Sequence, residues 1–174
     1  MLIDRDSYCD AATFLREEAE AWAPFKALLH VPDEILERPG DEDGPLAGSS
    51  GRALMVEMAQ DQENLVQIAK DLKDSSSSRT LGRLVFIWTE TGEDAMQRET
   101  HVRWRDVPLP EVRRRFLDSE MELRRALAQV PDEHWVLDVF HQGLFWMDTI
   151  KACKFRRPQL DAVLDSAERS RAGR

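Results

Sequence analysis

The sequence contains little cysteine and no long apolar run. Cys9 and Cys153 are the only cysteines among its 174 residues, too few for the disulfide framework of a small secreted domain. No stretch approaches the roughly 20 apolar residues that span a membrane, and the N-terminal residues lack the apolar segment of a signal peptide. We therefore expect a cytoplasmic protein with no membrane partner.

Basic residues are in the minority. The chain carries 24 Lys and Arg against 33 Asp and Glu, which gives a formal charge of −9. Such a surface repels the phosphate backbone of nucleic acids. The arginines at residues 113–115 lie in a segment otherwise rich in acids, a pattern typical of a solvated helix face. We therefore expect no nucleic-acid partner.

Local metal-binding motifs are missing as well. The four histidines never form an HxxxH or HExxH arrangement, so a histidine cluster would have to assemble in space. Cys153 has no base near it in the sequence, which is more typical of a buried thiol than of a nucleophile.

Helical periodicity is what the sequence does contain. Apolar residues recur at steps of three and four, which predicts an all-α fold. The length suits one domain, residues 1–174. Ser49 and Ser50 precede the second helix as candidate caps. Four long helices are expected, over residues 7–29, 54–72, 110–130 and 144–168.

Residues 79–104 are expected to form short extra helices. The stretch "LVFIW" within them suits either a buried strand or a helix face, and the spacing of Leu81, Leu84, Val85 and Trp88 favours the helix. A second, weaker helical pattern follows the break at Thr91-Gly92.

The tetrapeptide Val-Pro-Asp-Glu occurs twice, at residues 31–34 and 130–133. Each copy follows an amphipathic segment, and proline both ends a helix and suits the first turn of the next one. The repetition predicts two antiparallel helical pairs related by approximate internal symmetry, as in a four-helix bundle.

Two carboxylates interrupt the second helix's apolar stripe. The step from Met58 to Leu65 passes Asp61, and Glu57 lies one turn earlier. Partial burial of such a pair would raise the pKa of at least one carboxyl group, which suits an acid, a base or a ligand for a hard metal. The alternative is a solvated or ion-paired couple at the end of the bundle. His141 is a further candidate, although a lone histidine beside aromatic residues is more often a capping or packing residue.

Three segments resemble the DinB-like superfamily. "SSGRALMVEMAQDQE" resembles its second helix, "RWRDVPLPEVRRRF" is similar to its W-R-x-x-P-L-x-E-V segment, and "FWMDTIKACKFRRPQL" is similar to its last helix. The resemblance implies an up-down-down-up four-helix bundle, often a homodimer. It also implies a class that includes thiol-dependent transferases, isomerases and proteins of the colibactin self-resistance type.

The resemblance also places the family's three metal-binding histidines at Glu57, Ala152 and Arg156. Because alanine cannot ligate and a guanidinium repels a cation, we expect no metal and no other cofactor. An ion pair between Glu57 and Arg156 is expected in place of the metal.

The resulting hypothesis is a metal-free DinB-like bundle that binds or sequesters a small molecule in a stress or detoxification role. One alternative is a transferase, isomerase or hydrolase in which Glu57 or Asp61 acts as acid or base and His141 assists. A non-catalytic structural dimer is the other. The expected ligand-binding residues are Glu57, Asp61, Trp88, Trp104, His141, Trp146 and Arg156.

Overall fold

The computed structural model describes residues 8–173, and every named element in that range is helical. The expected all-α class is therefore confirmed. The elements are α1 (Ala11–Trp22), η1 (Ala23–His30), α2 (Asp33–Leu36), α3 (Gly51–Lys73), α4 (Arg79–Thr91), α5 (Glu93–Trp104), α6 (Leu109–Leu127), η2 (Asp132–His134), α7 (Val139–Trp146), η3 (Met147–Lys151) and α8 (Ala152–Ala172). Here η1 and η2 are 3₁₀ helices, and η3 is a π-helical turn.

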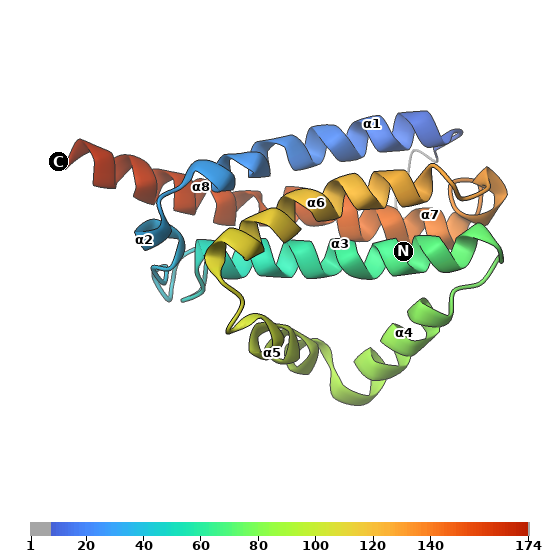
Figure 1. Ribbon diagram of the computed structural model, residues 1–174, viewed down its shortest axis with the longest axis horizontal. Helices are drawn as coiled ribbons and strands as arrows, with labels where there is room; N and C mark the ends of the chain where they lie inside the picture. Colours follow the sequence, from blue (N-terminus) through green and yellow to red (C-terminus); the bar gives the residue numbers. More distant parts are fainter. Residues whose placement is uncertain (1–7, 174) are drawn as a thin grey trace.

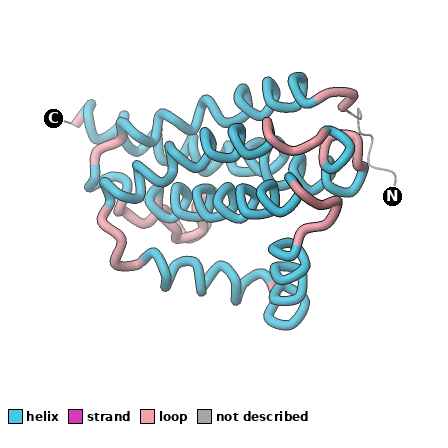
Figure 2. The backbone as a smooth tube through the Cα atoms, turned by 45° about the vertical axis from the view of Figure 1, so that its right-hand side comes forward, coloured by secondary structure: helices cyan, strands magenta, loops and turns pink. Residues whose placement is uncertain are grey.

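The long helices run up, down, down and up along the chain. In Figure 1, α1 with η1 and α7 with α8 run in one direction, whereas α3 and α6 run together in the other. Parallel neighbours cannot be joined by a tight turn, so the chain needs a long crossover between them. Helices α4 and α5 form that crossover and lie to one side of the bundle in both views (Figure 1, Figure 2).

Side-chain caps set the start of several helices. The Ser50 hydroxyl accepts a hydrogen bond from the backbone N–H of Ala53 at 3.2 Å, as the sequence predicted. Ser78 does the same for the N–H of Leu81 at 3.0 Å, and α4 follows. The helical interpretation of this stretch is therefore confirmed.

The first long segment departs from the prediction. A continuous α-helix was expected over residues 7–29, but α1 begins at Ala11, and a 3₁₀ helix replaces it from Ala23 to His30. The reason is Pro24, which has no N–H to donate and whose ring clashes with the preceding turn of an α-helix. Ser7, the predicted start, lies outside the described residues.

Both copies of Val-Pro-Asp-Glu start a short helix. The carbonyl of Pro32 accepts a hydrogen bond from Ile35 N–H at 3.0 Å, and the carbonyl of Pro131 accepts one from His134 N–H at 2.9 Å. The first copy is also held from α6, because Arg113 donates to the carbonyl oxygen of Val31. The two copies of the tetrapeptide thus mark equivalent corners, each between a long helical segment and a short helix.

A polar layer divides the core into two apolar clusters. One cluster contains Trp22, Met58 and Phe116, and the other contains Phe14 and Leu65. On each of α1, α3 and α6, polar side chains point inward at positions between the residues of the two apolar clusters. These side chains are almost completely buried, and they are Glu18, Gln62, Ser119 and Glu120.

No helix within residues 8–173 combines the length and the apolar character needed to cross a bilayer.

Candidate functional site

A cavity of about 370 Å³ lies between α3, α4 and the α7–η3 segment. One wall comes from α4, which turns Leu81, Leu84 and Trp88 toward α3, and Leu144 of α7 contributes to the opposite side. The complete lining is Asp61, Asn64, Leu65, Ile68, Leu81, Leu84, Val85, Trp88, Met96, Leu144 and Asp148. The cavity is therefore mostly apolar, with two carboxylates among its lining residues.

An ion pair joins α3 to α8 beside this cavity. Arg156 Nη2 donates a hydrogen bond to Asp61 Oδ2 at 2.8 Å. The side chain of Arg156 is 17% exposed and that of Asp61 41%, so the guanidinium is the more enclosed partner. Asp61 and Arg156, both predicted as site residues, are brought together here.

The predicted partner of Arg156 was wrong. Glu57 was expected to bind the arginine, but Glu57 Oε1 lies 3.0 Å from His101 Nε2 of α5 instead. Asp61 lies one turn further along α3, and the axial register of α8 brings Arg156 to that turn. Glu57 acts on Arg156 only as a more distant negative charge.

Asp148 is the second carboxylate of the cavity, and the sequence prediction missed it. It belongs to the π-helical turn Met147–Lys151 between α7 and α8. Such turns are rare and often occur at functional sites, because the extra residue changes the direction in which side chains point. Among the described residues, none donates a hydrogen bond to the Asp148 carboxylate, in contrast to Asp61.

The surroundings of Asp148 raise its pKa to about 6. The main cause is the loss of water around the carboxylate, the charge of Asp61 adds to it, and Arg156 opposes both. The Asp148 residue is exposed, although the protein atoms around its carboxylate weaken the solvation of its charge. A ligand can therefore reach the Asp148 carboxylate, although the charge of this carboxylate is weakly solvated.

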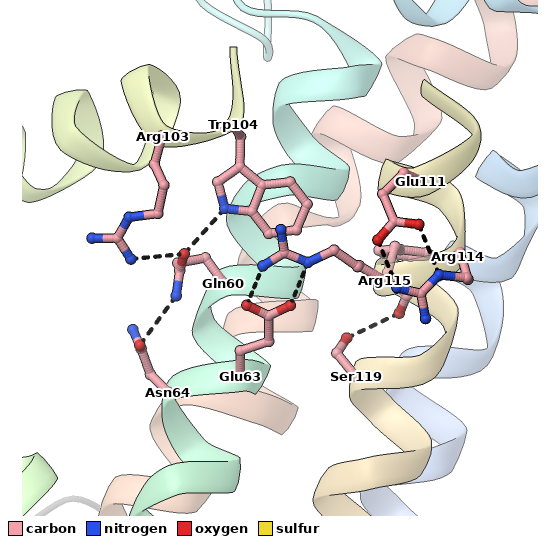
Figure 3. A network of polar contacts seen from close by, with 10 residues as sticks. Gln60, Glu63, Asn64, Arg103, Trp104, Glu111, Arg114, Arg115 and Ser119 are labelled. Carbon is pink, nitrogen blue, oxygen red and sulfur yellow. Dashed lines mark hydrogen bonds and ion pairs between the residues drawn. The ribbon is translucent and has the colours of Figure 1, made fainter. Parts of the chain in front are cut away.

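The tryptophans predicted for the site separate into different environments. Trp88 lines the cavity with 56% of its surface exposed. Trp104 is buried, donates its indole N–H to Gln60 Oε1 at 3.1 Å, and lies under the guanidinium of Arg115, which is paired with Glu63 (Figure 3). Trp104 therefore anchors α5 to α3 and α6 and does not line the cavity.

His141 and Trp146 also lie outside the cavity lining. His141 is 6% exposed in the first turn of α7, where its backbone N–H donates to Asp138 Oδ1 at 2.8 Å. Trp146 has the Lys151 ammonium 5.6 Å from its ring centroid. These contacts lie within residues 138–151.

The three residues that the DinB-like resemblance assigns to metal positions do not fit a divalent cation. Ala152 offers no ligand atom, Arg156 is a cation engaged by Asp61, and Glu57 contacts His101. Within residues 8–173, no group of three or more His, Cys, Asp or Glu side chains converges to hold a metal. A metal site would need about three such ligands.

Glu18 is a strongly perturbed carboxyl group, and it lies in the polar layer. Burial, followed by the charge of Glu120, raises its pKa to about 8, while Arg124 and Lys26 act in the opposite direction. Neither oxygen of Glu18 accepts a hydrogen bond. The spacing Phe14-Glu18-Trp22, with an acid one turn from each of two aromatics, was the available sequence signal.

Cys153 is a poor candidate nucleophile. Burial, followed by the charge of Glu18, raises the pKa of its thiol to about 12. The reactive thiolate is therefore scarce at neutral pH. This agrees with the prediction of a buried core cysteine.

A larger cavity of about 860 Å³ lies elsewhere, between the loop 39–46 and α8. None of the predicted site residues lines it. We place the candidate site in the smaller cavity because charged groups with perturbed environments meet apolar walls there.

Comparisons of the chain with protein-family models, with curated proteins and with solved structures found no match.

Proposed function

We propose that this chain is a metal-free, DinB-like bundle protein that binds or sequesters a small molecule in a stress-response or detoxification role. The cavity between α3, α4 and α7 carries the proposal, because a volume of about 370 Å³ and a mostly apolar lining with a few polar groups suit a small ligand. The up-down-down-up course of the helices supports the DinB-like part of the proposal.

The exposure of the cavity walls favours binding over a purely structural role. Helix α4 buries no residue, and Val85 and Trp88 of the lining are 49% and 56% exposed. Apolar surface in water is unfavourable by about 25 cal/mol per Å². A ligand that covers these side chains gains that free energy, whereas a filled core would offer no such gain.

Acid-base catalysis is the second candidate function, and Asp148 is the observation that favours it. A carboxyl group whose pKa is raised to about 6 can exchange protons near neutral pH. In this alternative Asp148 takes the role that the sequence suggested for Glu57 or Asp61, since Asp61 is committed to Arg156. His141 contributes no catalytic step, because it lies outside the lining.

Binding of the neutral, environment-sensitive dye Nile red tests the proposed function. The wild-type chain should enhance the dye's fluorescence saturably. Leu84→Trp should weaken this binding by at least about tenfold, because the larger ring occupies the cavity that Leu84 lines. The control is Leu137→Trp, which places the same ring at a 57% exposed position outside the lining.

If Leu84→Trp binds the dye as tightly as Leu137→Trp does, the cavity is not the binding site. The variants' circular dichroism spectra should match that of the wild type, which ensures that a loss of binding reports on the cavity.

A further inference from the structure

The charges around the cavity do not balance. The positive charge of Arg156 acts on the Asp148 carboxylate, but Asp61 engages this guanidinium at 2.8 Å. Asp148 then has no cation of its own and accepts no hydrogen bond from the described residues. Glu57 adds a further negative charge near Arg156 and is partnered by His101. The charged end of the cavity therefore has an excess of negative charge.

We propose that the cavity selects a small cationic amphiphile, with a protonated amine placed at Asp148 and an apolar body lying against Trp88, Leu84 and Val85. This inference rests on the proposed function and names its ligand class. The ammonium would donate hydrogen bonds to the free Asp148 carboxylate, and such charge-assisted bonds are stronger than neutral ones.

The apolar walls account for the other half of the ligand. Leu81 and Leu84 of α4 pack against the apolar cluster that contains Leu65 and Ile68 of α3, and Trp88 extends the apolar lining of the cavity. An exposed indole ring can stack on an apolar body or lie beside a cation. A molecule with one or two rings and a short amine arm would occupy both environments at once.

An anionic ligand is the competing class, since Arg156 lies close by. Its guanidinium is 17% exposed and already bonded to Asp61, so an anion would have to displace a carboxylate and also approach Asp148. A neutral ligand would fill the apolar part but leave Asp148 without a partner. Charge complementarity therefore selects the cation.

Titration of the full chain with three matched probes tests this inference. Phenylpropylamine, phenylpropanol and phenylpropionate share one hydrocarbon body and end in a cation, a neutral hydroxyl and an anion. Calorimetry is carried out at low salt and at a pH well above the pKa of Asp148. The amine should bind at least about tenfold more tightly than the alcohol, and the carboxylate should bind most weakly.

Asp148→Asn removes the charge and keeps the shape of the side chain. It should abolish the preference for the amine and leave the affinity for the alcohol unchanged. The control is Asp118→Asn, which removes one negative charge from α6, at a residue that pairs with Arg114 and does not line the cavity. This control should retain the preference.

The outcomes separate the two proposals. Equal binding of all three probes, or tightest binding of phenylpropionate, overturns the cationic class and leaves a binding cavity in place. A preference for the amine that persists in Asp148→Asn overturns the assigned position of the ammonium. Absence of binding by every probe, together with no saturable binding of Nile red, overturns the proposed function itself.

Discussion

Replacing Glu18 with glutamine should stabilise the protein near neutral pH. It should also remove most of the contribution that Glu18 makes to the pH dependence of the unfolding free energy. Glu18 is 1% exposed, and neither of its oxygens accepts a hydrogen bond. A carboxylate in such a place is poorly solvated, so the folded chain holds its proton up to a pH of about 8. Glutamine has nearly the same shape and no charge to solvate, so the polar layer keeps its volume.

The direction of this pH dependence follows from the pKa values of Glu18 in the unfolded and in the folded chain. Below its ordinary pKa of 4.5, both the folded and the unfolded chain carry the proton, and Glu18 adds no pH dependence. Between pH 4.5 and about 8 only the folded chain keeps it, so the free energy of unfolding falls by about 1.4 kcal/mol per pH unit as pH rises. The total loss is about 5 kcal/mol, of which about 3 kcal/mol is already lost at pH 7.

Urea unfolding of the wild type and of Glu18→Gln across this pH range measures the effect. The difference in unfolding free energy should be small near pH 4.5 and should grow to about 3 kcal/mol in favour of the variant at pH 7. The control is Glu20→Gln, which removes an exposed acid from the same helix. A difference between Glu18→Gln and wild type that does not change with pH would refute the assignment of a buried, protonated Glu18.

The remaining predictions concern the candidate site. A double-mutant cycle of Asp61→Asn and Arg156→Met, measured by urea unfolding, should give a coupling of about 1–2 kcal/mol. The more exposed pair Arg157–Asp161 should give less, and equal couplings would contradict the partial burial of Arg156. Purified protein should contain no near-equimolar zinc or nickel by elemental analysis, because Ala152 and Arg156 offer no ligand for a cation and Glu57 contacts His101; a tightly held metal at one per chain would contradict this. Affinity for phenylpropylamine should rise as pH increases through about 6, because Asp148 ionises beside Asp61 and Arg156; a calorimetric affinity that is flat from pH 5 to 7 would exclude Asp148 as the anion.

Sequence patterns predicted the helices well where their causes are local. Apolar spacing located α3 and α6, and Ser50 was identified as a cap because capping involves only the next few residues. The prediction failed over residues 23–30, although Pro24 was visible in the sequence. Asp61 was singled out because it interrupts the apolar stripe of α3, and it lies in the cavity lining, while the buried residue that follows it, Gln62, was overlooked.

The sequence by itself determined the helical segments, the two proline corners and the excess of acidic residues, because these depend on neighbours along the chain. Only the tertiary structure decided that Arg156 meets Asp61, which is 95 residues away, and that Asp148 shares a cavity with Trp88. The physical reason is that a contact between helices depends on their axial register and rotation. A shift of one turn, about 5.4 Å, would exchange one carboxylate for another.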